Sequence, residues 1–423
     1  MKSKEKKVSE KNFIPRVLSL LVFVLSFISG YCQSGNIELS GDSQIGVSTE
    51  RFKRYDRFLK DEISNGRIPG AVSFVMRKDE IIHNEAFGFS DISNKSPMDI
   101  DNIFFIQSMT KPIISAGIMM LYEEGHFLLT DPVSKYLEGF KALRVIKDME
   151  EGIDGESEPW EGEITIAQLL THTAGFSHGL GASKYDQQLR AELFEKEYAN
   201  IEEKVSHFLT IPLANEPATQ WRYSAATDVL SVLIEKFSGM STERFLTERI
   251  FVPLGMDDTG YNLPKSKFKR IVQLHTYNQE NKLTKSDFQP SPNDNKVFTG
   301  VNGLFSTTSD YMKFCQMLFN GGEFQGKRLL SGKTVELMAM NHLRNMEIAP
   351  GRGFGLGFGV VEDVTQSGIV GLKGQFYWGG AFCTYFLIDP EEELISILMT
   401  QVWPYSEYYA NKMRQFVYQA IDD

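Results

Sequence analysis

The stretch Phe104–Glu124, FFIQSMTKPIISAGIMMLYEE, decides the fold because it joins a potentially reactive pair to an apolar run. Ser108 precedes Lys111 by three residues, so both side chains lie on one face of a helix. The run Ile113–Leu121 has the spacing of a buried helix. A serine at a helix start lies where backbone N–H groups favour negative charge, and a lysine among apolar neighbours loses preference for its charged form. The stretch therefore predicts a serine nucleophile with a lysine base.

The Ser-x-x-Lys pattern is common, so its surroundings must support the interpretation. It also occurs at 3–6 and 266–269, in polar, lysine-rich surroundings, whereas Ser108 opens an apolar helix. The alternative is that Ser108 only caps the helix and that Lys111 is a solvated residue of its first turn.

The first 32 residues have the composition of a secretory signal. Met1–Arg16 carries six Lys or Arg against two Glu, and the short apolar run Val17–Ile28 follows. We expect cleavage near Gln33 and a periplasmic or secreted protein. Two alternatives stay open: a lipid anchor on Cys32 and an uncleaved N-terminal anchor. Contact with a membrane is expected only through such a segment.

Charge and cysteine content narrow the possible functions. The whole chain has a net charge of −11, and removal of residues 1–32, which carry a net +4, leaves −15. Such acidity argues against nucleic-acid binding. Cys315 and Cys383 have apolar neighbours that suit buried thiols at least as well as a disulfide. The seven histidines show no paired metal spacing, so we expect neither a metal site nor a cofactor.

Helices are predicted in the middle of the chain and strands at both ends. Residue patterns predict a hairpin at 69–91, strands at 354–362, 366–372, 381–388 and 394–400, and helices at 48–65, 113–121, 164–172, 201–209, 227–237, 241–250, 310–319, 332–340 and 408–421. This order predicts an α+β fold, with one antiparallel sheet made from both chain ends, flanked by the terminal helices, and an inserted all-helical lobe.

The predicted domain follows the signal and a polar linker. We place the linker at 33–47 and one domain at 48–423. Its α/β lobe takes about 48–110 and 300–423, and its helical lobe takes about 111–299.

Two further stretches add chemistry to the Ser108 pair. Tyr223 precedes a helix and offers a phenol as a proton carrier or lysine partner. Trp378-Gly379-Gly380-Ala381 is predicted on an edge-type strand, where the paired glycines let a substrate carbonyl approach closely. A backbone N–H there, together with that of Ser108, would form an oxyanion hole, in which one donor typically lowers the barrier by ~3 kcal/mol. Trp378 is expected on the pocket wall, with simple packing as the alternative.

These stretches, in this order, resemble the serine β-lactamase and penicillin-binding-protein superfamily. Further matches are LLTHTAGF (169–176), YS (223–224), PLGM (253–256) and GLFS (303–306). From Arg51 to the C-terminus the chain resembles the class C β-lactamase-like group, and most of all its family VIII carboxylesterases. The resemblance implies that Ser108 is the nucleophile, that Lys111 and Tyr223 form the proton-transfer pair, and that the N–H groups of Ser108 and Ala381 form the oxyanion hole.

Two departures from the superfamily's motifs affect the expected substrate. The usual Tyr-x-Asn is Tyr223-Ser224-Ala225 here, so the amide that would hold a substrate amide is missing. Trp378-Gly379-Gly380 replaces Lys-Thr-Gly, and tryptophan cannot pair with the carboxylate of a β-lactam. The Trp-Gly-Gly form is similar to that of the esterases in this group. Ester hydrolysis also suits the lost amide contact, since an alcohol leaves more easily than an amine.

A competing motif lies at Gly175-Phe176-Ser177-His178-Gly179, which matches the Gly-x-Ser-x-Gly elbow of α/β-hydrolases. That elbow needs a strand before it and a helix after it. Here a helical segment precedes the motif and a polar loop follows, so we favour a turn after His172. We expect His172 itself to stabilise that turn rather than to act as a base.

The sequence therefore predicts an exported serine hydrolase, a carboxylesterase for small or medium esters that works through an acyl-enzyme on Ser108. One alternative is an amidase or peptidase for D-amino acids, or a weak β-lactamase, acting on peptidoglycan-like substrates. Another is a non-catalytic scaffold that retains the fold. The expected partner is a small-molecule ester or amide.

Overall fold

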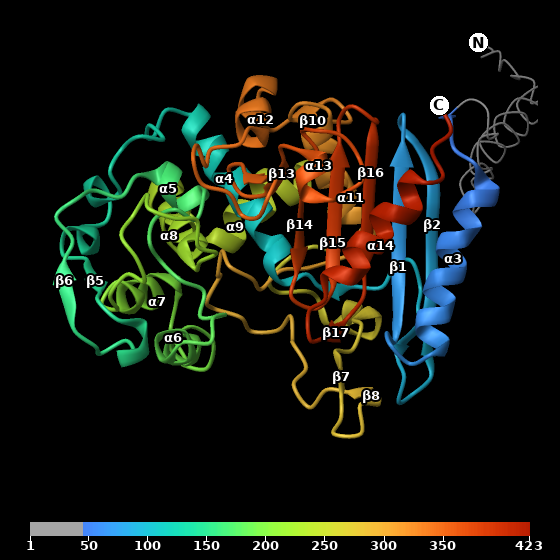
Figure 1. Ribbon diagram of the computed structural model, residues 1–423, viewed down its shortest axis with the longest axis horizontal. Helices are drawn as coiled ribbons and strands as arrows, with labels where there is room; N and C mark the ends of the chain where they lie inside the picture. Colours follow the sequence, from blue (N-terminus) through green and yellow to red (C-terminus); the bar gives the residue numbers. More distant parts are fainter. Residues whose placement is uncertain (1–44) are drawn as a thin grey trace, which may run out of the picture. The chain divides into compact units, whose positions relative to one another are not determined.

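The computed structural model describes residues 45–423 (Figure 1). The predicted signal at 1–32 and most of the predicted linker at 33–47 lie outside the described residues, and they stay predictions. Val47, at the end of that linker, is buried and forms a bridge with Ile421.

The centre of the fold is an eight-stranded sheet made from both ends of the chain (Figure 1). Its order is β12 (Arg352–Phe354), β13 (Gly359–Val361), β14 (Phe376–Gly380), β15 (Thr384–Asp389), β16 (Leu394–Met399), β1 (Gly70–Arg77), β2 (Glu80–Asp91) and β3 (Ser96–Pro97). The two ends meet where β1 pairs with β16 in antiparallel register, from Val72 opposite Met399 to Arg77 opposite Leu394. The α+β fold predicted from the sequence is confirmed.

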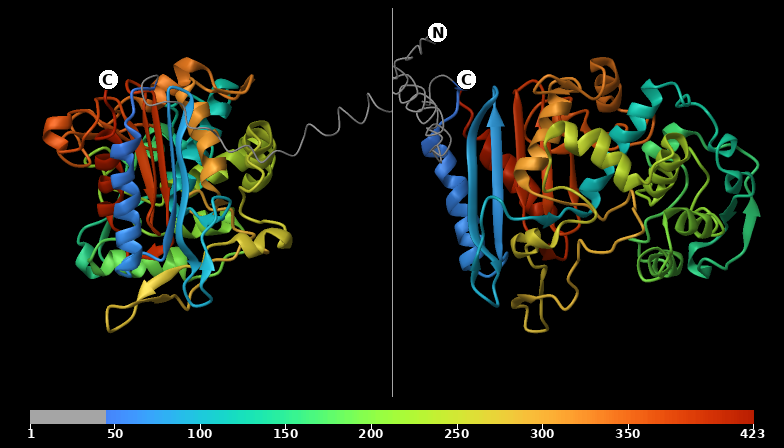
Figure 2. Two further views of the ribbon diagram at one scale, coloured as in Figure 1. Left: turned by 90° about the vertical axis from the view of Figure 1, so that its right-hand side faces the viewer. Right: turned by 180° about the vertical axis from the view of Figure 1, so that it is seen from behind.

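Both faces of this sheet are covered by helices, which explains why every residue of β1 is buried. Ala71 and Val75 pack with α3 (Thr49–Ser64) and α14 (Glu407–Tyr418). Val72 and Phe74 belong to the larger core on the opposite face, with α11 (Thr308–Phe319). Figure 2 shows the helices on the two sides of the sheet. The period of two along the strand thus feeds two separate cores.

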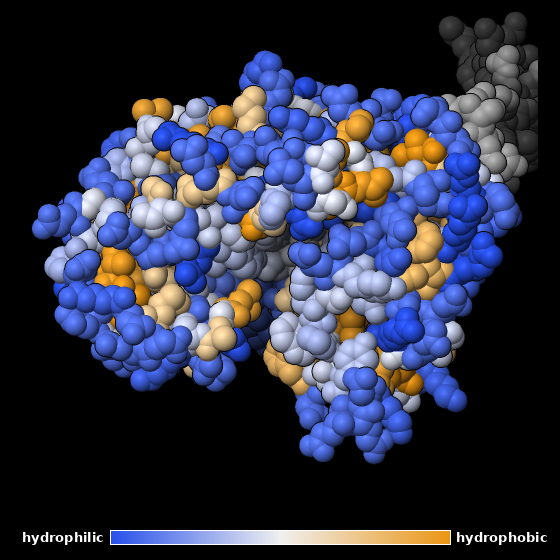
Figure 3. Space-filling view, viewed as in Figure 1, coloured by the Kyte–Doolittle hydropathy of each residue, from blue (hydrophilic) through white to orange (hydrophobic). Residues whose placement is uncertain are grey.

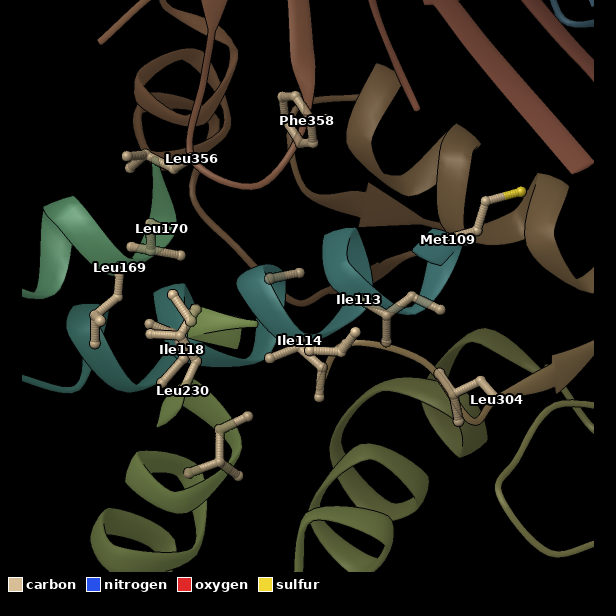
Figure 4. Packing of buried hydrophobic residues seen from close by; sticks show 14 of the residues in the cluster. Met109, Ile113, Ile114, Ile118, Leu169, Leu170, Leu230, Leu304, Leu356 and Phe358 are labelled. Carbon is tan, nitrogen blue, oxygen red and sulfur yellow. The ribbon is translucent and has the colours of Figure 1, made fainter. Parts of the chain in front are cut away.

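Helix α4 (Thr110–Glu123) joins the sheet to a mainly helical region (Figure 1). Ile113, Ile114 and Ile118 are fully buried, and Figure 4 shows their packing against neighbouring elements. Burial of each such side chain contributes about 1.5–3 kcal/mol. The helical region contains α5 (Ile166–Leu170), α6 (Lys184–Phe194), α7 (Ile201–Phe208), α8 (Ala226–Ser238), α9 (Thr242–Leu246) and the ribbon of β5 (Arg144–Ile146) and β6 (Ser157–Pro159).

Short elements complete the fold. They are β4 (Phe104–Phe105) paired with β9 (Phe305–Ser306), β7 (His275–Tyr277) between β8 (Leu283–Lys285) and β17 (Val402–Trp403), β10 (Glu323–Phe324) with β11 (Lys327–Arg328), and the helices α10 (Val252–Leu254), α12 (Gly332–Ala339) and α13 (Val364–Ser367).

Three strand predictions near the C-terminus are wrong in detail. The strand predicted at 354–362 is two strands, because the chain turns back at Gly357, whose φ is +112°. The strand predicted at 366–372 is absent: the Asp363 carboxylate accepts the N–H groups of Thr365 and Gln366 and starts the short helix α13 instead. The strand predicted at 381–388 begins only at Thr384, after a turn.

The sequence left open whether Cys315 and Cys383 form a disulfide. Cys315 and Cys383 are both buried free thiols. Within residues 45–423, no helix has the length and apolar character needed to cross a membrane.

Candidate active site

Ser108 lies in a tight turn held from several sides. The 3-10 turn Gln107–Met109 directly precedes α4, with Gln107 at a φ of +49°. Ile106 N–H donates to the Leu304 carbonyl at 3.0 Å, and the Tyr311 hydroxyl donates to the Met109 carbonyl at 3.0 Å. These bonds fix the serine at the N-terminal end of an apolar helix, where the helix dipole favours negative charge.

Lys111 lies directly beneath this serine. Its Nζ is 3.4 Å from Ser108 Oγ and donates to the Val301 carbonyl at 2.9 Å. The side chain is only 1% exposed, and burial lowers its pKa well below the usual 10.5, although Asp228 opposes this shift. A neutral amine in this place has a lone pair available for the serine proton.

Tyr223 closes the other side of the pair. Lys111 Nζ lies 4.6 Å from the centroid of the Tyr223 ring. Its hydroxyl is inaccessible to solvent. Burial raises the pKa of this phenol, while the neighbouring Ser108 hydroxyl and Trp378 indole oppose the rise. The phenol is therefore a proton donor at neutral pH rather than an anion.

The glycine pair brings β14 against the serine turn. A Cβ on Gly380 would lie 2.3 Å from the Ile106 carbonyl oxygen, so only glycine permits this approach. β14 is an interior strand and not the predicted edge, but β13 pairs with it only at Phe376 and Tyr377. The segment 378–380 therefore has one unpaired side. Ala381 lies in the turn that follows, beside the same pocket as Ser108.

A pocket of about 330 Å³ opens above Ser108. The space-filling view is hollowed between the helical region and the sheet (Figure 3). Of the residues predicted for the site, all except Lys111 line the pocket: Ser108, Tyr223, Trp378, Gly379, Gly380 and Ala381. Other aromatic residues of its wall are Trp221, Tyr377, Tyr385, Phe386, Trp403 and Tyr405. The structure thus brings together residues that are up to 273 positions apart in the chain, from Ser108 to Ala381.

Comparison with known families agrees with this geometry. The sequence model of the family described as Beta-lactamase matches residues 55–418. The chain belongs to the Beta-lactamase family. The match covers the sheet strands from both ends of the chain and the whole of the site.

Several characterised and uncharacterised proteins are similar to this Beta-lactamase family member. Protein Rv1367c of Mycobacterium tuberculosis is 30% identical over 360 residues, which cover 82% of this chain and 89% of that protein. Acyltransferase mokF of Monascus pilosus is 28% identical over 71% of this chain and 73% of its own length. Esterase EstB of Burkholderia gladioli is 25% identical over 82% and 89%.

Solved structures share the fold of the Beta-lactamase family member described here. EstCE1, a hydrolase with promiscuous acyltransferase activity, superposes with a TM-score of 0.75 at 23% identity, covering 87% of this chain and 99% of its own. Simvastatin synthase LovD from Aspergillus terreus superposes with a TM-score of 0.73 at 24% identity, covering 87% and 97%.

His172 contacts the Tyr223-Ser224 segment of this Beta-lactamase family member. His172 has a φ of +56°, as the predicted turn requires, and its Nδ1 lies 2.9 Å from Ser224 Oγ. Its ring packs edge-on against Tyr223, with 5.0 Å between centroids. Burial and Lys111 lower the His172 pKa well below 6.5, so the ring is neutral. In the sequence, only the presence of His172 in the stretch LLTHTAGF points to this contact.

The competing Gly-x-Ser-x-Gly motif does not form a nucleophile elbow. Helix α5 precedes it and no strand leads into it. Ser177 is buried, and its Oγ donates to Asp186 Oδ1 at 2.6 Å. This hydrogen bond links Ser177 to α6, and it engages the hydroxyl that a nucleophile would need to have free. Among the described residues, no group of His, Cys, Asp or Glu is arranged to hold a metal ion.

Proposed function

We propose that this protein is an exported carboxylesterase that forms an acyl-enzyme on Ser108. The observation that carries the proposal is the convergence of a buried lysine, a buried phenol and a serine at an aromatic pocket. Such a pocket with a few convergent polar groups is typical of small-molecule sites.

The proposed reaction begins with proton removal. Neutral Lys111 takes the proton of Ser108, and the freed oxygen attacks the ester carbonyl carbon. The N–H groups of Ser108 and Ala381 hold the resulting oxyanion. The C–O bond to the alcohol breaks as Tyr223 gives its proton to the leaving alkoxide and takes the proton from Lys111, so that both groups are neutral again. Water then attacks the acyl-enzyme by the same proton route and releases the acid.

Two features support an ester over an amide or a β-lactam. Trp378 stands where the family's lactamases have lysine, and its Nε1 is buried without a partner in residues 45–423. Ala225 stands in the asparagine position and is fully buried, so it offers no group to a substrate amide. Trp221 Nε1 and the Tyr223 hydroxyl are also partnerless donors beside the pocket. Such donors suit the oxygens of an ester.

Acyl transfer to an alcohol is a second candidate. The name of mokF and the description of EstCE1 both include acyl transfer. An acceptor alcohol would enter the same pocket as the ester. The same acyl-enzyme would then react with an alcohol instead of water.

The proposal of export rests on residues 1–32 alone. Their basic start and short apolar run are those of a secretory signal, with the lipid anchor on Cys32 as the alternative. Fractionation of cells and determination of the mature N-terminus would test it.

The direct test is hydrolysis of p-nitrophenyl butyrate by the wild type and by Ser108→Ala. We expect the variant to lose turnover while retaining its unfolding temperature. A D-alanyl amide, a cephalosporin and a competing alcohol acceptor, offered in parallel, would separate the alternatives. Wild-type rates in Ser108→Ala would refute the assignment.

A further inference from the structure

A buried ion pair lies behind the proposed base. Lys204 Nζ, from α7, is 2.9 Å from Asp228 Oδ2, in the first turn of α8. Their side chains are 5% and 2% exposed. Buried ion pairs give little net stability, because desolvation opposes the attraction between the charges. Neither residue takes a step in the proposed reaction, so the pair needs another explanation.

One residue, Val301, connects this pair to the proposed base through its two backbone groups. Val301 N–H donates to Asp228 Oδ1 at 3.0 Å, and the Val301 carbonyl accepts from Lys111 Nζ at 2.9 Å. Gly300 permits the contact, since a Cβ there would lie 2.1 Å from the Thr227 carbonyl oxygen. Asp228 thus holds in place the residue whose carbonyl positions Lys111.

The charges of Asp228 and Lys204 have opposite effects on the protonation of Lys111. A buried carboxylate near Lys111 stabilises its ammonium form, whereas the Lys204 cation destabilises it. His172 and His178 also lie near Lys111, and burial keeps both rings neutral. The carboxylate of Asp228 and the ammonium of Lys204 are therefore the charges that act on Lys111.

The remaining titratable neighbours carry no charge at neutral pH. Tyr223 faces Lys111 with its ring, and the Ser108 hydroxyl lies above it. Tyr261 is close enough to Asp228 for the carboxylate to raise its pKa further, so this phenol also stays protonated. Lys204 Nζ also lies 5.5 Å from the centroid of the Phe194 ring.

We propose that Lys204 is a positioning residue of the active site: it neutralises Asp228, so that Asp228 holds Val301 in place without holding a proton on Lys111. This inference rests on the proposed function, because it explains how the base of that reaction stays neutral. It adds two residues that touch neither the substrate nor the reacting atoms.

The test is the pH dependence of kcat/KM for p-nitrophenyl butyrate in two single variants. Lys204→Met leaves Asp228 unpaired, so protonated Lys111 becomes more stable and the acid limb moves to higher pH by about one unit. Asp228→Asn keeps an acceptor for Val301 N–H but removes the negative charge, so the limb moves to lower pH. Opposite shifts are a result that a purely structural role would not produce.

Two further variants complete the experiment. Lys204→Met/Asp228→Asn lacks both charges and should return the limb to within about half a unit of wild type. Lys147→Met removes an exposed lysine that pairs with Glu156 and should move nothing. If Lys204→Met does not fold, the comparison of Lys204→Met/Asp228→Asn with Asp228→Asn still gives the sign of the Lys204 effect. Single variants with the wild-type limb, or with shifts of equal sign, would overturn the inference.

Fluorophosphonate labelling separates this inference from the proposed function. Labelling of wild type at Ser108, together with unmoved limbs in the variants, would overturn only the role of Lys204. Folded wild type without labelling would overturn the proposed function and this inference with it.

Discussion

Lys111 is the residue on which activity and stability oppose each other. The pKa of Lys111 in the folded protein lies well below the usual 10.5. At pH values between the folded and the usual pKa, Lys111 is therefore protonated in the unfolded chain and neutral in the folded protein. The free energy of unfolding therefore rises with pH across this window, and at neutral pH the burial of Lys111 destabilises the fold. Activity needs the same neutral amine and falls as pH drops through its folded pKa.

Replacing Lys111 should therefore separate the two effects. We expect Lys111→Met to lower kcat/KM for p-nitrophenyl butyrate by about 10²–10⁴-fold, the usual contribution of a general base. We also expect a higher unfolding temperature at pH 7, with a smaller gain between pH 7 and pH 9 than in wild type. Calorimetry at the two pH values measures this difference. A variant that is inactive and less stable at pH 7 would contradict the explanation.

At this scale the sequence identified the residues through their spacing and surroundings. Ser108 and Lys111 are local neighbours, so helical geometry alone brought them together. Tyr223, Trp378 and the two glycines came from the family resemblance and their neighbours. The contact between His172 and Ser224 could not be predicted, because it depends on the positive φ of His172 and on tertiary packing.

The elements that meet at the site depend on a close approach of backbones. β14 contacts the turn before α4 because Gly380 lacks a side chain, and Thr384 Oγ1 donates to the Ile106 carbonyl at 3.4 Å. This approach sets the separation between the N–H groups of Ser108 and Ala381. Small displacements of such donors lower the reaction rate strongly.

The substitution Gly380→Ala tests this alignment. The new methyl group would meet the Ile106 carbonyl and push β14 away, so we expect kcat to fall by about 100-fold and unfolding to become easier by about 1–3 kcal/mol. Gly332→Ala is the control, since its Cβ would have no neighbour closer than 3.8 Å. Kinetics and thermal unfolding of both variants measure the effects. Equal activities in the two would contradict the proposed role.

The predicted helices and strands are correct where a periodic pattern runs over many residues. They are wrong where a side chain forms hydrogen bonds with the backbone beside it. The α3 helix, the β1–β2 hairpin and α8 were predicted within two residues of their bounds. The strand expected at 366–372 failed because Asp363 bonds to the two N–H groups that follow it and starts a helical turn. Propensity over short windows carries no information on such a competing bond.

For the whole molecule, the decisive feature is that one sheet contains both ends of the chain. Arg77, at the end of β1, is 3% exposed and donates to the carbonyls of Ile45 and Gly46. It also pairs with Glu392 at 3.0 Å and Asp423 at 2.7 Å. One side chain therefore links the start of the described chain, the β15–β16 turn and the C-terminus.

Loss of this link should weaken the fold and spare the chemistry. We expect Arg77→Met to lower the free energy of unfolding by about 1.5–3 kcal/mol, the usual range for hydrogen bonds to a charged group. Below the unfolding transition, kcat should stay at the wild-type value. Arg328→Met is the control, because Arg328 is largely exposed and should change stability by less than about 0.5 kcal/mol. Denaturant unfolding of both variants decides the matter, and equal stabilities would refute the argument.

The order of strands and helices allowed the sheet from both ends to be predicted, since helices fill the middle of the chain. The order β16-β1 itself was not predictable from composition, because pairing of distant strands depends on the registers that the two cores impose. The predicted lobe boundaries at about 110 and 300 stay predictions.

The central claim is a covalent acyl-enzyme on Ser108. Intact-protein mass spectrometry after acid quench, within seconds of adding p-nitrophenyl butyrate, tests it most directly, with peptide mapping to locate the added mass. The account predicts one butyryl group on Ser108 in the wild type and none in Ser108→Ala. No added mass on a wild type that turns over the ester, or the same mass on another residue, would contradict it.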